Sequence, residues 1–300
     1  MAVSTYPTAY SPIKEPVIFG IDNSGVVEVS INSYYKQLPS TTRSVNVAPY
    51  YRGDFEITPL LESGSFNAST IGRVVSASIS IDGTASDSVP LLYGDSLPAQ
   101  DMFLTDLKHR AVADGEIDEV MVYGGSVASL VAFANTQTQS VLTIGSNNSP
   151  WVYAFKPSSY AVSGRVTLQL RNSSGEVLDE ISYTTTEQRG INVAWLNAYG
   201  TIDRAIIYRN TAEISVEKES IYLSGGYSNI DIIAEETITA HTKPLRESDT
   251  RAISYILNSD LVWMQENGEW VGIDVTSTSA YVYQDAELSP MEVTFRRKKR

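Results

Sequence analysis

The chain has 300 residues, a net charge of −13 and no cysteine. Its 42% hydrophobic residues are enough for buried cores and exclude a disordered tail. The lack of cysteine excludes disulfides, thiolate metal ligands and cysteine nucleophiles, and the negative charge disfavours nucleic acid and anionic membranes as partners of the protein body.

The first fifteen residues are predicted to be an extended arm. Pro7, Pro12 and Pro16 exclude a helix here, and Ser, Thr and Tyr lie between them. Met1 to Ile18 has no apolar signal core, and the longest near-apolar stretch, 127–134, is too short to span a bilayer. We therefore expect synthesis in a cytoplasm, a soluble protein and no membrane partner.

Strand-like runs of β-branched and aromatic residues follow at regular intervals, with Asp82-Gly83 as a turn. They predict a first β-sandwich module over residues 16–124 and a second over 125–210. The second contains a hairpin, 166–170 with 177–183, around the turn at 172–175. The predicted strands of the first module are 17–21, 26–31, 44–49, 55–57, 74–81 and 120–123.

Residues 211–295 are predicted to form a third, β-rich module. Glu247, Ser248 and Asp249 indicate a helix start, and apolar residues at helical spacing follow, which predicts one short helix near residues 248–258. A hairpin is predicted around Asn267-Gly268, with closing strands at 281–283 and 291–295. The fold class is therefore mainly β, with two to three tandem antiparallel β-sandwich (Ig-like) modules.

One phrase occurs twice. The chain reads G-x-I-D-x-x-x-x-Y from Gly115 to Tyr123 and again from Gly200 to Tyr208. Each copy is a glycine turn followed by a run typical of a strand buried on both faces. The spacing of the copies is about the length of one small β-sandwich, which indicates a chain built from similar modules.

The search for catalytic residues finds no candidate. The two histidines, His109 and His241, are far apart in sequence, and neither has a second histidine at ligand spacing. There is no G-x-S-x-G elbow and no glycine-rich phosphate loop. The acidic cluster at residues 114–119 lacks a calcium-loop pattern, so whether an ion binds there stays open. We expect no enzyme activity, no cofactor and no metal centre.

Two aromatic groups have two interpretations. Trp195 precedes the second copy of the repeat, and Trp263 is predicted to face Trp270 across the hairpin. Each could stack on a sugar ring, or each could close one end of a sandwich as an aromatic contact.

The C-terminus is five consecutive cations, Arg296, Arg297, Lys298, Lys299 and Arg300. This run is either a solvated tail or a basic arm for an acidic neighbour, a second copy of the chain or packaged nucleic acid. With Tyr6, Tyr10 and Pro12 of the N-terminal arm, it forms our candidate assembly site. Both termini are expected to become ordered only in an assembly, by adding strands to open sheet edges.

Several short segments stand out in a fixed order along the chain: 10–12, 16–19, 49–57, 195–203, 257–262 and 270–275. Together they resemble multi-module β-sandwich virion proteins of tailed phages and prophages of Bacteroides-like bacteria. The resemblance covers most of the chain, but Thr201 replaces the second glycine of the family's W-L-N-x-x-G-G-x-D, and 205–207 replace its aromatic residues.

The resemblance implies a non-enzymatic structural component of a bacteriophage virion, in the tail or the head-tail region. Its partners would be other copies of itself and other virion structural proteins, and the family has no catalytic residues to transfer. The alternative is a phage fibre or adhesin that binds host surface glycan through Trp195, Trp263 or Trp270.

Overall fold

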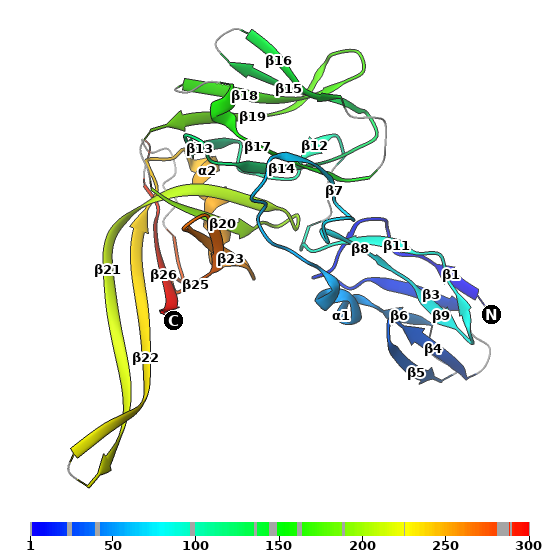
Figure 1. The fold of residues 1–300 in the computed structure, drawn as a ribbon. Coiled ribbons are helices and arrows are strands. Elements are labelled where there is room, and N and C mark those ends of the chain that lie inside the picture. Colours follow the sequence, from blue (N-terminus) through cyan, green and yellow to red (C-terminus); the bar gives the residue numbers. More distant parts are fainter. Residues whose placement is uncertain are drawn as a thin grey trace.

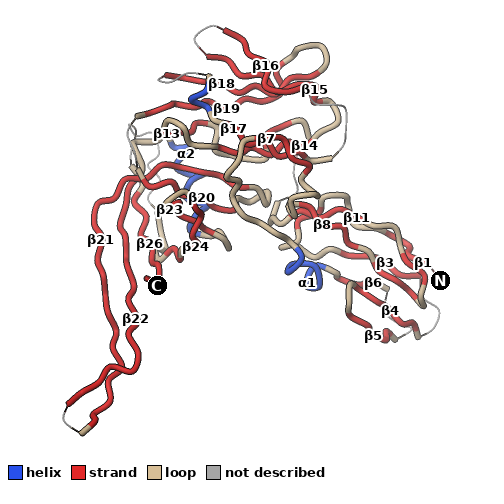
Figure 2. Tube along the Cα trace, in the orientation of Figure 1, coloured by secondary structure: helices blue, strands red, loops and turns tan. Residues whose placement is uncertain are grey.

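The computed structural model describes residues 2–22, 26–39, 43–96, 100–134, 137–143, 149–160, 164–187, 190–224, 226–280, 288 and 290–299. Strands dominate it and form several mainly antiparallel sheets (Figure 2), so the predicted mainly β fold is confirmed. Within the described residues, no helix is both long enough and apolar enough to cross a membrane.

The N-terminal module consists of three small sheets around one core that includes Phe19, Ile79 and Leu91. Helix α1 (Ala48–Tyr51) and the 3-10 turn η1 (Arg52–Asp54) follow β6, where the sequence predicted a strand as far as residue 49; residues 55–57 are not a strand. The sheets are β1 (Ala2–Thr5), β3 (Ile18–Asp22) and β6 (Ser44–Asn46); β10 (Thr84–Ala85), β9 (Ile79–Ile81), β4 (Val27–Ile31) and β5 (Tyr34–Leu38); and β2 (Ser11–Pro12), β11 (Val89–Leu92) and β8 (Val74–Ala77).

The predicted N-terminal arm over residues 1–15 is wrong for residues 2–15, which belong to this module. Strand β1 pairs antiparallel with β3, and β2 pairs in parallel with β11. The prolines exclude a helix, but they leave the residues between them free to pair, and Pro12 is tolerated because β2 lies at the edge of its sheet.

The middle module is a β-sandwich whose core contains Val120 and Val122 from one sheet and Leu130, Leu168 and Ile181 from the other. Strand β13 pairs in parallel with β19, and the 3-10 turn η2 (Pro157–Ser159) follows β17. The first sheet is β12 (Met102–Phe103), β14 (Asp118–Tyr123), β17 (Trp151–Phe155) and β7 (Gly64–Asn67); the second is β13 (His109–Ala113), β19 (Val177–Thr186), β18 (Gly164–Asn172), β15 (Val127–Ala134) and β16 (Gln137–Thr143).

The C-terminal module is one strongly curled sheet. Its two edge strands, β24 and β25, are separated in the chain by Ile273 alone, so the curl brings the two edges together. The predicted helix is confirmed as α2 (Glu247–Ser254) with the 3-10 turn η3 (Tyr255–Leu257), which packs Ile253 and Ile256 into the core. In order, the strands are β24 (Glu269–Gly272), β23 (Val262–Glu266), β20 (Ile191–Leu196), β21 (Ile202–Leu223), β22 (Gly226–His241), β26 (Glu292–Lys299) and β25 (Asp274–Val275).

The predicted domain boundaries at 124/125 and 210/211 are wrong. Strand β14 pairs with β17, so residues 118–123 belong to the same sandwich as the strands that follow them. The second boundary falls inside β21, which runs unbroken from Ile202 to Leu223. Regular strand spacing cannot show which strands share a sheet, because pairing in a sandwich joins residues that are distant in the sequence. The predicted strand at 281–283 lies outside the described residues.

The repeated phrase joins two modules at one buried arginine. Gly115 and Gly200 have φ of 79° and 76°, and each supports the turn before its strand. Asp118 of β14 and Asp203 of β21 both bind Arg110 of β13, with Nη1–Oδ2 at 2.9 Å and Nη2–Oδ1 at 2.6 Å. All three side chains are buried. Burial works to lower the pKa of Arg110, but the two carboxylates outweigh it and raise that pKa, so the guanidinium stays charged.

The next residue of each copy extends the contact to the third module. Glu119 of β14 binds Arg204 of β21 at 2.6 Å and Arg73 of the N-terminal module at 3.0 Å. Adjacent strand residues point to opposite faces, so residues 118 and 119 serve two separate contacts. The buried charge network, which we define as Arg73, Arg110, Asp118, Glu119, Asp203 and Arg204, balances three cations with three anions. It therefore holds all three modules together.

Replacing Arg110 with Met is expected to destabilise the protein by about 3–5 kcal/mol, because two carboxylates would stay buried without their cation. Urea unfolding measures this, and Arg110→Met with Asp118→Asn and Asp203→Asn should recover part of the loss. The control is Arg251→Met, which removes an exposed pair with Glu247 and should cost less than about 1 kcal/mol. An equal loss in the free energy of unfolding for Arg110→Met and Arg251→Met would contradict a structural role of the buried Arg110 ion pairs.

Candidate interaction site

The predicted arm residues at the N-terminus lie within the N-terminal module. Pro12 is buried, and the Tyr6 ring meets Phe19 edge-on at 5.8 Å. The Tyr10 ring packs against Tyr123 of the middle module at 4.6 Å, and burial raises the pKa of Tyr10. These side chains therefore stabilise their own chain.

The predicted basic tail is also part of the fold. Strand β26 extends to Lys299 and pairs with β22, placing Lys298 opposite Glu235 and Lys299 opposite Ala234. Arg296 binds Asp274 at 2.7 Å, and Arg297 forms ion pairs with Glu236 and Glu266. The prediction of a separate tail at 296–300 is therefore wrong for residues 296–299, because acidic residues of the same sheet bind the arginines; Arg300 lies outside the described residues.

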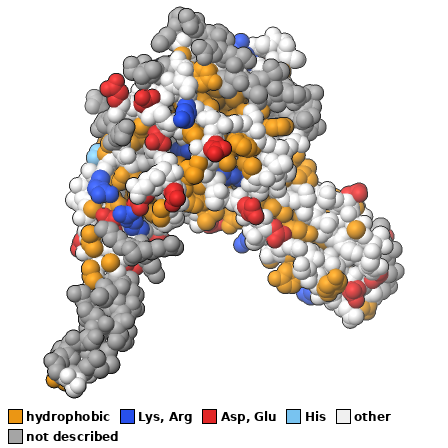
Figure 3. All heavy atoms as spheres, viewed as in Figure 1, with side chains coloured by type: hydrophobic (Ala, Val, Ile, Leu, Met, Phe, Trp, Pro, Cys, Tyr) orange, Lys and Arg blue, Asp and Glu red, His pale blue; other side chains and the backbone are white. Residues whose placement is uncertain are grey.

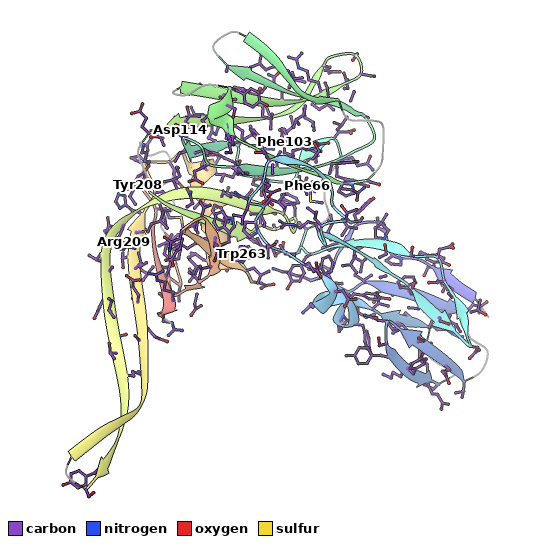
Figure 4. The ribbon with its side chains drawn as sticks, viewed as in Figure 1. Phe66, Phe103, Asp114, Tyr208, Arg209 and Trp263 are labelled. Carbon is purple, nitrogen blue, oxygen red and sulfur yellow. The ribbon has the colours of Figure 1, made fainter. Side chains whose placement is uncertain are left out.

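The three candidate tryptophans, Trp195, Trp263 and Trp270, do not form open platforms for sugar rings. Trp195 is 0% exposed in the core of the C-terminal module, so its predicted role in glycan contact is wrong. Trp263 of β23 is only 8% exposed (labelled in Figure 4), and the Arg204 guanidinium lies 4.9 Å from the centre of the Trp270 ring. Trp263 pairs with Gly272 and Trp270 with Gln265, so the two rings are diagonal neighbours rather than a direct cross-strand pair.

A groove of about 1110 Å³ lies beside this hairpin and brings two predicted groups together, Trp263 with Trp270 and Arg296 with Arg297. Its guanidiniums are already bound by carboxylates of the same sheet, as described above. The arginines are therefore not free to bind a partner. The lining also has more carboxylates than cations, together with apolar side chains.

The described residues contain no group of three or more histidines and carboxylates placed to hold a metal ion. His109 Nδ1 lies 3.1 Å from Asp249 Oδ1, and His241 packs near the Tyr208 ring. Of the acidic cluster at 114–119, Asp118 and Glu119 are turned inward to the arginines of the network. This pairing accounts for two of the four carboxylates of the cluster; Asp114 is exposed and Glu116 is half-buried.

The feature that the sequence analysis missed is a long two-stranded arm formed by β21 and β22. It projects from the body. The N-terminus lies far from it, whereas the C-terminal strand β26 pairs with β22 at its base (Figure 1). Tyr208 and Arg209 mark the point where β21 leaves the body (Figure 4). Strand β20 pairs with β21 as far as Ile207, and beyond it no described strand pairs with that edge.

The base of this arm has two different faces. Ile214 and Val216 are 53% and 48% exposed, and apolar side chains are visible where the arm leaves the body (Figure 3). Glu213, Ser215 and Glu217 alternate with them and are also exposed. The alternation at 212–217 is the signal that could have revealed the arm, but a module boundary was predicted at this point.

Comparisons with known proteins do not identify the chain. No protein-family model matches it, and no match is found among curated protein sequences. Among solved structures, it is similar to the Bacteroides ovatus mixed-linkage glucan utilization locus protein SGBP-B in complex with a mixed-linkage heptasaccharide, with 8% identity, a TM-score of 0.24, and coverage of 98% of this chain and 74% of that one. The Plexin A4 extracellular region gives 7% identity and a TM-score of 0.20, and the similarity covers 99% of this chain and 35% of that one. Scores this low establish no shared fold or function.

The placement of the N-terminus predicts a measurable protection of its amides. Ile13 N donates to Leu92 O at 2.8 Å and Lys14 N donates to Gly94 O at 3.0 Å. In the isolated protein, these amides should exchange hydrogen roughly a hundredfold more slowly than in a free peptide. Mass spectrometry of fragments covering residues 8–15 checks this. Exchange at the free-peptide rate would contradict this placement and support the predicted N-terminal arm that is not ordered in the isolated protein.

Proposed function

We propose that this chain is a non-enzymatic structural component of a bacteriophage virion, in the tail or the head-tail region. It would assemble with copies of itself and with neighbouring virion proteins, and its place of action would be the particle. The sequence phrases that resemble virion proteins support this proposal. The single observation that carries the assembly role is the projecting arm of β21 and β22.

An isolated two-stranded ribbon is marginally stable in water and exposes unpaired backbone groups along its edges. Strand β26 covers β22 only from Ala234 to His241, and β20 covers β21 only to Ile207. Long, exposed ribbons of this kind are stabilised when a neighbouring chain covers them. The arm therefore supports a protein that functions within an assembly.

The rest of the fold suits such a role because the arm grows directly out of the buried charge network. Asp203 and Arg204 lie at the start of β21, the same strand that forms one side of the arm. This connection fixes the point at which the arm leaves the three modules, and a register shift between Arg209 and Thr211 lies just beyond it. A fixed point of departure suits repeated, symmetric contacts between subunits.

Replacing both exposed apolar residues, Ile214→Asp with Val216→Asp, is expected to weaken self-association at least about tenfold, since it removes apolar area that the contact would bury. Sedimentation velocity over a range of concentrations measures this. The fold should be unchanged, because both side chains are exposed in the single chain.

The matched control is Leu61→Asp with Val177→Asp, two exposed apolar residues away from the arm. This variant should associate as the unchanged protein does. A protein that stays monomeric at every concentration, or equal association of both variants, would contradict an assembly role for the arm.

A further inference from the structure

The open edge of β21 has a side-chain pattern that specifies what could pair with it. From Ala212 to Glu217, apolar and polar residues alternate strictly, and all six are exposed. Because successive side chains of a strand point to opposite faces, Ala212, Ile214 and Val216 share one face, and Glu213, Ser215 and Glu217 share the other. A strand added here would meet an apolar row on one face and an acidic row on the other.

The opposite side of the same ribbon shows how the chain satisfies such a pattern. There β26 pairs with β22, with Phe295 opposite Ile238 on the buried apolar face. On the other face, Arg296 Nη1 lies 3.8 Å from Glu235 Oε2. Arg297 forms an ion pair with Glu236 on the same face as Phe295, and Lys298 is the register partner of Glu235. An apolar and basic strand therefore already covers one acidic edge of the ribbon, whereas no described strand covers the other.

We propose that the open edge of β21 over residues 208–217 receives an extended segment of a neighbouring protein that alternates apolar and basic residues. Backbone hydrogen bonds to the edge would supply much of the affinity, and the two rows of side chains would select the segment. The register of β21 shifts between Arg209 and Thr211, so the regular part of the edge is 211–217; it spans about 23 Å, enough for a segment of about seven residues. The identity of the neighbour as a virion protein rests on the proposed function, but the chemistry of the edge does not.

The same pattern disfavours pairing of two copies of the chain through this edge. In the antiparallel register centred on Ser215, Glu213 of each copy would lie opposite Glu217 of the other. Like charges directly opposite each other destabilise a strand pair. The segment that binds this edge is therefore a basic one rather than the β21 edge of a second copy in that register. Self-association through Ile214 and Val216 would use the apolar face of the arm and leave this edge open.

The test uses two labelled synthetic peptides, one alternating valine with lysine and arginine, the other alternating valine with glutamate. Fluorescence anisotropy measures their binding to the full chain. The unchanged protein should bind the basic peptide and not the acidic one. The variant Glu213→Lys with Glu217→Lys should lose at least about tenfold in affinity for the basic peptide and gain affinity for the acidic one.

The matched control is Glu15→Lys with Glu62→Lys, which makes the same change in net charge at exposed residues of the N-terminal module. It should bind the basic peptide as the unchanged protein does. An equal loss of affinity in the control would mean that the peptide binds through the overall charge of the protein, which would overturn the proposal. Unchanged binding of the basic peptide by the Glu213→Lys with Glu217→Lys variant would overturn it too.

A second measurement tests strand addition itself. The basic peptide is made in two forms, N-methylated at odd or at even positions, so that each form loses the hydrogen-bond donors of one edge. Only one form should lose binding, because only one edge of the peptide meets β21. Equal binding of both forms would overturn the proposal. If the peptide does not add as a strand but the protein still self-associates, the proposed function is retained and the binding edge is not. If the protein binds the basic peptide but never assembles, the binding edge is retained and the proposed function is not.

Discussion

Everything in this structure depends on six charged side chains that are removed from water where three modules meet. Burying a charge is costly unless an opposite charge and good hydrogen bonds accompany it, and here three arginines and three carboxylates do so. Each member comes from a strand or loop that could not move without leaving a buried charge unpaired. The network therefore gives the modules one relative arrangement, which apolar packing alone would define less sharply.

The consequence for function is that the arm of β21 and β22 has a fixed origin. The strand that contributes Asp203 and Arg204 to the network continues without a break to Leu223. The apolar face of the curled sheet, which contains Ile238 and Phe295 in its core, continues outward onto the arm as Ile214 and Val216. The arm is thus an extension of a core that its own chain does not cover. In our proposal, a neighbouring protein completes it.

The sequence was sufficient to predict features that depend on local pattern: the β class, the helix after Glu247 and the turn at Asn267-Gly268. It was not sufficient for features that depend on distant pairing. The repeat was visible, but nothing local shows that Asp118 and Asp203 share Arg110. The basic run at 296–299 looked like a tail because the glutamates of β22 that it meets are far away in the sequence. A long hairpin looks like two ordinary strands until their register is known.

Hydrogen exchange, compared between the isolated protein and its assembled form, distinguishes an open strand edge from a covered one. Amides of β13 and β14, around the network, should be protected in both states. Within 208–217, the amides that point to the open edge, and so do not donate to β22, should exchange quickly in the isolated protein and become protected on assembly, because an added strand takes up the edge. Equal protection of these amides in the two states, or rapid exchange of β13 and β14 in the isolated protein, would contradict the proposal.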